Sequence, residues 1–160
     1  MHVFPYLLTT QITLKMVKKY VEVGPLGGSG GENLWSIIPN GGRITRINIR
    51  SGAIVDAIYF DYTEGGTTYQ TDIFGGRNGI LSTFDIADDE EFIEIRGQVG
   101  NFENLNLVTQ LTFVTNKNTY GPYGTNEGTN FSCPIAKGKV IGFFGRYGAY
   151  LDAIGVVISP

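Results

Sequence analysis

Two aspartates in this chain of 160 residues each follow a glycine by four positions, in closely similar surroundings. Asp56 ends the run Gly52-Ala53-Ile54-Val55-Asp56, and Asp152 ends the run Gly148-Ala149-Tyr150-Leu151-Asp152. Glycine tolerates positive φ and lets a ligand come close to the backbone, while a carboxylate offers two acceptor oxygens. Backbone N–H donors beside a carboxylate suit a molecule with adjacent hydroxyl groups, such as a sugar. An isolated turn of this kind is more often purely structural, with the aspartate bonding its own backbone.

The pattern belongs to a repeat. Gly52, Gly100 and Gly148 stand 48 residues apart, and the segments 52–58 and 148–154 share five of seven residues. The middle copy has Asn104 four residues after its glycine. Because an amide lacks the charge that strengthens hydrogen bonds to a carboxylate, we expect this copy to be weak or silent as a binding site.

A second repeated element is rich in glycine. LGGSGG at 26–31 resembles FGGRNG at 74–79, again 48 residues later, and YGPYG at 120–124 is a weaker third copy. A fixed period of this length is the sign of repeated structural units. The chain is therefore interpreted as three copies of one unit.

The segments that join these elements have the pattern of strands. Apolar residues alternate with polar ones over 107–115, and no window keeps a helical period. Glycine is frequent, at 23 residues, while charged residues make up only 17%. We predict one all-β domain, a closed body of about twelve strands in three sheets, in which closure removes exposed edges.

Composition excludes several functions. A net charge of −3 provides no basic footprint for nucleic acid. The lone Cys133 allows no intrachain disulfide, and the lone His2 near the terminus disfavours a histidine metal site or a Ser–His triad. We therefore expect no metal, no cofactor and no catalytic residue.

The first residues differ from the rest. Residues 1–19 contain three lysines and no acid. Their apolar part is too short to span a membrane and makes a poor signal peptide. We predict a poorly ordered N-terminal extension over 1–19 and a domain over 20–160, with a weak targeting segment or an extra strand as the alternatives for the extension.

The domain resembles the jacalin-related lectins. The likeness runs from about residue 20 to residue 160 and rests on four segments. These are GPLGGSGG at 24–31, LTFVTNK at 111–117, TYGPYG at 119–124, and the stretch from GFFGR at 142–146 to Gly155. The resemblance implies a β-prism of three four-stranded antiparallel sheets with pseudo-threefold symmetry, and a non-enzymatic, carbohydrate-binding function.

The resemblance also implies which residues bind sugar. In the first site the backbone of Gly31 and of the loop Ala149, Tyr150 and Leu151 would face the sugar, and Asp152 would accept bonds from two hydroxyls. Members of the banana lectin type have a second site on another repeat. The residues of this chain that match it are Gly79, Gly52, Ala53, Ile54, Val55 and Asp56.

Specificity and assembly are further expectations from the family. Galactose-binding members are cleaved before the key glycine, whereas Ser29-Gly30-Gly31-Glu32 looks like an intact connection. The resemblance thus implies selectivity for mannose and glucose, mannose-rich glycans as partners, a homo-oligomer (dimer or tetramer) and a cytoplasmic location, with the vacuole or secretion as alternatives. We also expect no membrane insertion.

Two other functions compete with this interpretation. Asp56 and Asp152 would have to lie within about 10 Å of each other to act as a glycosidase pair, and equivalent positions of different repeats should be farther apart. A protein-interaction module on the same fold would not need either carboxylate. The acidic run 88–91 lacks the spacing of a calcium loop, so we expect a solvated hairpin turn there, and a buried structural thiol at Cys133.

Overall fold

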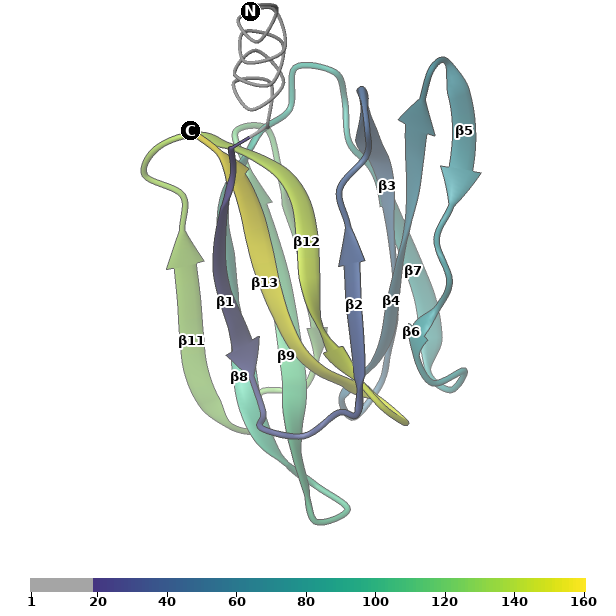
Figure 1. The fold of residues 1–160 in the computed structure, drawn as a ribbon. Coiled ribbons are helices and arrows are strands. Elements are labelled where there is room, and N and C mark those ends of the chain that lie inside the picture. Colours follow the sequence, from purple (N-terminus) through teal and green to yellow (C-terminus); the bar gives the residue numbers. More distant parts are fainter. Residues whose placement is uncertain (1–18) are drawn as a thin grey trace, which may run out of the picture.

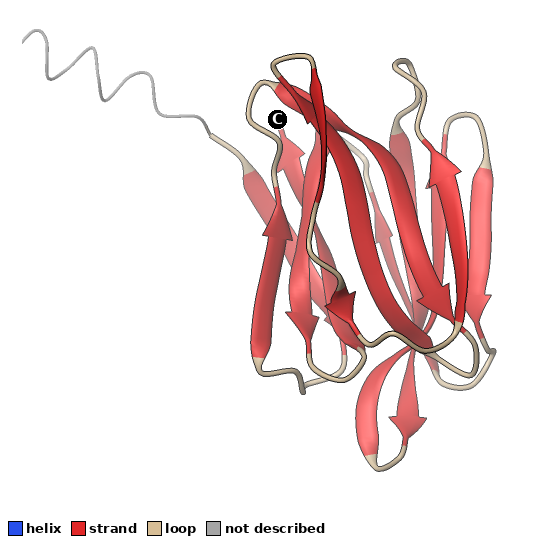
Figure 2. Cartoon of the chain, turned by 90° about the vertical axis from the view of Figure 1, so that its right-hand side faces the viewer, coloured by secondary structure: helices blue, strands red, loops and turns tan. Residues whose placement is uncertain are grey.

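The computed structural model describes residues 19–160, so the predicted extension over 1–19 lies, apart from its last residue, outside the described part. Thirteen strands and no helix make up this part of the chain (Figure 2). The strands are β1 (Val21–Gly27), β2 (Asn33–Ile37), β3 (Gly42–Ser51), β4 (Val55–Glu64), β5 (Thr67–Gln70), β6 (Phe74–Gly75), β7 (Ile80–Asp85), β8 (Phe92–Phe102), β9 (Leu105–Thr115), β10 (Thr119–Gly124), β11 (Thr129–Pro134), β12 (Lys139–Tyr147) and β13 (Leu151–Ser159).

The strands form three antiparallel sheets, as predicted. The sheets have the orders β1-β13-β12-β2, β10-β9-β8-β11 and β5-β4-β3-β7, the last with β6 also paired to β4. Each sheet has two hairpin-connected central strands and an outer position on either side of them, so the repeat found in the sequence is also the repeat of the fold. The first strand β1 pairs with the last strand β13, which brings the beginning and end of the domain into one sheet (Figure 1).

One sheet differs from the prediction of four strands. Its outer position beside β4 is divided between β5 and β6, which pair with opposite ends of β4. Between them, the Thr71 N–H donates to the Phe60 carbonyl at 2.9 Å and the Thr71 hydroxyl accepts from the Phe60 N–H at 3.0 Å. Because the threonine side chain takes a place in the ladder, the outer strand is interrupted there.

The core lies on the prism axis, where the inner faces of all three sheets meet. Phe143 of β12 packs against Phe60 of β4 with ring centroids 5.4 Å apart, and against Phe113 of β9 at 6.0 Å. All three rings are fully buried. Trp35 is buried as well, and so is Cys133, as expected. Burial raises the pKa of the Cys133 thiol, which favours the unreactive protonated form.

One end of the prism holds the acidic run 88–91. The prediction of a hairpin turn there is wrong in one respect, because the run connects β7 of one sheet to β8 of another. Nor are its carboxylates all solvated, since Glu90 is buried and accepts hydrogen bonds from Thr115 and Tyr120. Glu90 therefore ties the connection to β9 and β10 of the sheet that the chain enters.

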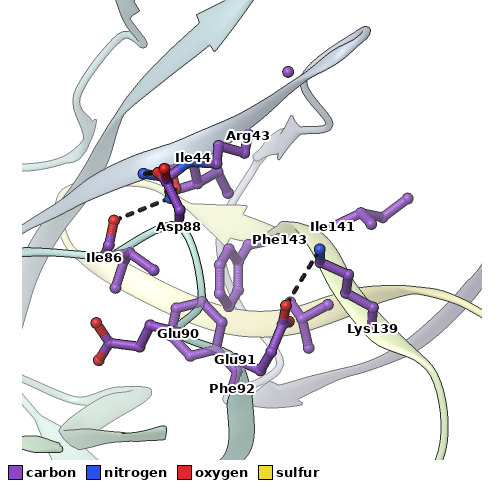
Figure 3. Close-up of a pocket in the computed structure, with 12 residues that line it drawn as sticks. Arg43, Ile44, Ile86, Asp88, Glu90, Glu91, Phe92, Lys139, Ile141 and Phe143 are labelled. Atoms are coloured by element: carbon purple, nitrogen blue, oxygen red, sulfur yellow. Dashed lines mark hydrogen bonds and ion pairs between the residues drawn. The ribbon is translucent and has the colours of Figure 1, made fainter. Parts of the chain in front are cut away.

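A cavity of about 170 Å³ opens at this same end (Figure 3). Phe92 and Phe143 form part of its apolar wall, and the ion pairs Arg43–Asp88 and Lys139–Glu91 lie at its margin, at 2.7 Å and 3.2 Å. The ten residues of β3 run from this end to the aspartate loops, which places the two ends roughly 30 Å apart.

Candidate functional site

The first candidate site lies where β1 gives way to β2 and β12 turns into β13. The glycine-rich loop over 28–32 follows β1, and Gly148, Ala149 and Tyr150 connect β12 to β13. Asp152 is the second residue of β13. The Gly28 N–H donates to the Asp152 carbonyl at 2.8 Å, which fixes the two segments to each other. The residues predicted for the first site are therefore brought together.

Glycine is required where the two segments approach most closely. Gly31 has φ +91°, and a Cβ atom placed on it would lie 2.8 Å from Asp152 Oδ1. A Cβ on Gly30 would lie 3.0 Å from Asp152 Oδ2. The loop therefore presents bare backbone to the Asp152 carboxylate. Any side chain at these positions would fill the space from which a hydroxyl group could reach both the backbone and the carboxylate.

The Asp152 carboxylate is prepared to accept hydrogen bonds. Its residue is only 6% exposed, and burial raises its pKa, while the charge of Arg146 and the Gly148 N–H lower it. The Tyr150 N–H has no backbone acceptor in the described part of the chain. The Tyr150 N–H and the Asp152 carboxylate thus provide a free donor and a partly desolvated acceptor two residues apart. Vicinal hydroxyl groups, which both donate and accept hydrogen bonds, need such a pair.

Arg146 holds the glycine-rich loop in place. Its guanidinium donates to the carbonyl oxygens of Gly28 and Gly30, at 2.8 Å and 2.5 Å. A planar guanidinium can hold two acceptors in fixed directions. Arg146 was not among the predicted site residues, and its signal was present in the sequence, because Arg50 and Arg146 both stand two residues before a repeated glycine.

The second candidate site repeats this geometry between β3–β4 and the loop over 76–79. The Gly76 N–H donates to the Asp56 carbonyl at 2.9 Å, and a Cβ on Gly79, which has φ +80°, would lie 2.5 Å from Asp56 Oδ2. Asp56 is also 6% exposed, and burial raises its pKa while Arg50 lowers it.

The connecting loop of the second site has a different side chain at its tip. The loop consists of Gly52, Ala53 and Ile54, and the Ile54 N–H has no backbone acceptor among the described residues. The Ile54 side chain is buried, whereas Tyr150 in the first site is partly exposed. Val55 is buried in β4. The residues predicted for the second site therefore lie together, and Ile54 and Val55 can offer a ligand their backbone but not their side chains.

The third repeat has neither the carboxylate nor the open loop. The position equivalent to Asp56 and Asp152 is Thr109, because its carbonyl accepts from Thr125 N–H at 3.0 Å as theirs accept from Gly76 and Gly28. The interpretation of Asn104 as the equivalent residue is therefore wrong. Asn104 lies instead in the turn of the β8–β9 hairpin.

The reason is a longer hairpin. Gly100 does occupy the position of Gly52 and Gly148, but Thr109 follows it by nine residues instead of four. The additional residues extend β8 and β9 beyond the other loops (Figure 1). The third glycine loop is also closed against its neighbour, since a Cβ on Gly128 would lie 2.2 Å from the Val99 carbonyl.

The three repeats meet at this end in a ring of contacts. A Cβ on Gly28 would meet the Asn106 carbonyl, one on Gly76 would meet the Ala149 carbonyl, and the Thr125 hydroxyl donates to the Ala53 carbonyl at 2.7 Å. Each glycine loop therefore leans on the hairpin of another repeat, and the two candidate sites share one face of the molecule.

The extended hairpin reaches the first site. The Tyr150 hydroxyl donates to Glu103 at 3.0 Å, which raises the pKa of Tyr150. The ring of Tyr150 packs edge-on against Phe102 with centroids 5.6 Å apart. These contacts hold Tyr150, the one aromatic side chain of the first site's loop, and fixed spacing in the sequence could not indicate them.

No other constellation competes with these loops. Among residues 19–160, no group of three or more metal-ligating side chains is assembled. The same part of the chain also has no helix with the length and apolarity needed to cross a bilayer.

The three-sheet prism, with backbone donors and a buried carboxylate at two of its three repeats, defines a protein of the β-prism sugar-binding class. Residues 23–157 match the model of the jacalin-like lectin domain. The chain belongs to the jacalin-like lectin family, and it is a carbohydrate-binding jacalin-related lectin rather than an enzyme.

Relatives support this assignment over nearly the whole domain. Horcolin of Hordeum vulgare is 39% identical over 147 residues, which are 90% of this chain and 100% of horcolin. A mannose/glucose-specific lectin of Parkia pendula is 39% identical over 90% of this chain and 33% of its own length. Among solved structures, a mannose binding jacalin related lectin from Ananas comosus superposes with a TM-score of 0.80 at 40% identity, covering 88% of this chain and 98% of that one.

Proposed function

We propose that this lectin is selective for mannose and glucose and that it binds them at two sites per chain. The observation that carries the proposal is the duplicated close approach of a bare glycine backbone to a buried carboxylate, Gly31 to Asp152 and Gly79 to Asp56. The mannose/glucose specificity of the Parkia lectin and the mannose binding of the Ananas lectin support the choice of sugar.

The two aspartates would share one mode of binding. Each carboxylate would accept hydrogen bonds from two adjacent hydroxyl groups, while N–H groups of the preceding loop donate to the sugar oxygens. A polar site built to bond a hydroxyl discriminates strongly against ligands that lack it, because its buried groups would be left unpaired. Affinity for a single sugar should be modest, with a Kd on the order of 1 mM.

Avidity would then come from several sites acting together. Two sites per chain already allow a branched glycan or a surface to be held at two points. We also propose a homo-oligomer, dimer or tetramer, and the outer strand β1 supports this because Val21 and Val23 are exposed on it. Light scattering measures the oligomeric state directly.

Calorimetric titration with methyl α-mannoside and methyl α-galactoside tests the proposal. We expect the mannoside to bind at two sites per chain, and Asp56→Asn and Asp152→Asn each to remove one. The matched control is Asp88→Asn, which changes an exposed carboxylate at the opposite end of the prism. Circular dichroism shows whether each variant is folded.

The other outcomes are equally clear. A preference for galactoside would overturn the specificity and keep the sites. If the folded wild type binds neither sugar, the proposal fails and a protein-interaction module on the same fold becomes the better interpretation.

A further inference from the structure

The two glycine loops differ by one charge. Both loops span three residues between glycines of positive φ, Gly27 and Gly31 in the first site and Gly75 and Gly79 in the second. At the middle position the first loop has Ser29 and the second has Arg77. The two loops therefore share their flanking glycines, and only the loop of the second site has a cation between them.

The charge of Arg77 is available for a ligand. The residue is exposed, and within the described part of the chain it forms no ion pair or hydrogen bond. The cation that lowers the pKa of Asp56 is Arg50. Arg146, in the first site, is already engaged by two loop carbonyls. Arg77 is thus not needed to hold either loop.

The backbone places Arg77 on the rim between the two sites. Its neighbour Gly76 donates to the Asp56 carbonyl at 2.9 Å. On its other side, Gly76 lies so close to the first site's loop that a Cβ would be 2.5 Å from the Ala149 carbonyl. The loop that carries Arg77 is therefore anchored at its base, and its side chain leaves from a fixed point beside Asp56.

The surroundings of the first site are acidic by comparison. Glu32 follows its glycine loop and is exposed, and Glu103 lies against Tyr150. Like charges placed together are costly and select against the wrong ligand. The first site therefore disfavours an anionic sugar, whereas the second site offers a free guanidinium, whose planar fork matches phosphate and carboxylate groups.

We propose that the second site prefers hexoses that carry an anionic group, a phosphate or the carboxylate of a uronic acid, with Arg77 pairing the anion while Asp56 holds the sugar hydroxyls. This inference rests on the proposed function and adds the ligand class of one site. The two sites would then divide their work, with neutral hexoses at Asp152 and anionic hexoses at Asp56.

The experiment isolates the second site with Asp152→Asn and titrates four ligands. These are methyl α-mannoside, α-mannose 1-phosphate, mannose 6-phosphate and glucuronic acid, so that phosphate and carboxylate are separated. We expect at least one anionic ligand to bind about fivefold tighter than methyl α-mannoside at low ionic strength, as for an exposed ion pair. Added salt should reduce this ratio.

Exchange of the distinguishing residue provides the matched control. Arg77→Ser, which installs the residue of the first loop, should bring the ratio of anionic to neutral affinity down to about one. In the Asp56→Asn background, which isolates the first site, Ser29→Arg should raise that ratio.

Failure of the inference is distinguishable from failure of the proposed function. If methyl α-mannoside binds and no anionic ligand gains, or if the gain survives Arg77→Ser, this inference is wrong and the lectin function stands. If the wild type binds no sugar at all, both are wrong.

Discussion

Two buried carboxylates give sugar binding a definite dependence on pH. Burial raises the pKa of Asp56 and of Asp152, and the nearby arginines offset only part of this rise. Sugar hydroxyls donate to the ionised form, so binding is complete above the raised pKa and is lost as the pH falls through it. An ordinary aspartate has a pKa of about 4. We expect affinity for methyl α-mannoside to decline already as the pH falls from neutral toward that value, because the pKa of both carboxyl groups is raised. Calorimetry should also detect proton release on binding within that interval.

The raised pKa of the two aspartates makes stability change with pH in the opposite direction to sugar affinity. The folded protein holds the proton more tightly than the unfolded chain, so the free energy of unfolding falls as the pH rises through the raised pKa. Asp152→Asn, which cannot titrate, should flatten part of this slope in denaturant unfolding.

Affinity that stays constant down to pH 4 would contradict the assignment of Asp56 and Asp152 as the acceptors.

Gly31 offers a second test at the level of a single residue. An alanine there must adopt φ +91° and would place its Cβ 2.8 Å from Asp152 Oδ1. We expect Gly31→Ala to lower affinity at the first site at least about tenfold, measured in the Asp56→Asn background, because a lost charge-assisted bond alone contributes about that much.

Gly41 separates strain from obstruction. It also has positive φ, +68°, but a Cβ would meet nothing within 4 Å. Gly41→Ala should therefore cost roughly 1–2 kcal/mol of stability from backbone strain and leave titrations with sugar as they were. Equal loss of binding in both variants would mean that strain, rather than contact with the carboxylate, is the cause.

At the level of elements, the β8–β9 hairpin distinguishes the third repeat from the other two. Phe102 pairs with Leu105, so Glu103 and Asn104 form a two-residue turn with φ 51° and 64°. Such turns favour glycine at the second position. We expect Asn104→Gly to raise the free energy of unfolding by about 0.5 kcal/mol, measured by chemical denaturation.

The companion variant addresses binding. Asn104→Asp should leave the number of sugar sites unchanged, because the aspartate would lie in the hairpin turn and not at the position of Thr109. A third site created by Asn104→Asp would overturn the equivalence drawn from the backbone hydrogen bonds.

This hairpin also shows what the sequence could and could not predict. The glycine period of 48 located Gly100 correctly, at the position of the chain that Gly52 and Gly148 occupy in the other two repeats. Thr109, the position equivalent to the two aspartates, was missed because five further residues lengthen the loop after Gly100. A fixed spacing cannot reveal an insertion. The contacts of Tyr150 with Glu103 and Phe102 depend on that insertion, so they became visible only in three dimensions.

At the scale of the whole molecule, a closed all-β body of three sheets could be predicted because repetition and alternation are local patterns, whereas the prism was implied by the family resemblance. The contacts between loops of different repeats leave no such local pattern in the sequence. Gly76 touches Ala149, and Thr125 bonds to Ala53, across repeats distant in sequence. Arg50 and Arg146 could have been identified from their common offset before a repeated glycine, since two of the three repeats place an arginine near the equivalent carboxylate.

The pairing of the first strand with the last determines how this lectin can be attached to anything else. Val21 lies opposite Ile158, and the C-terminus leaves from the end of the prism away from both aspartate loops (Figure 1). A tether, a membrane anchor or a further domain joined at the end of β13 would therefore point the ligand-binding face outward. The same geometry is compatible with joining several such domains in one polypeptide. The Parkia pendula lectin is a longer polypeptide, and this chain matches 33% of it.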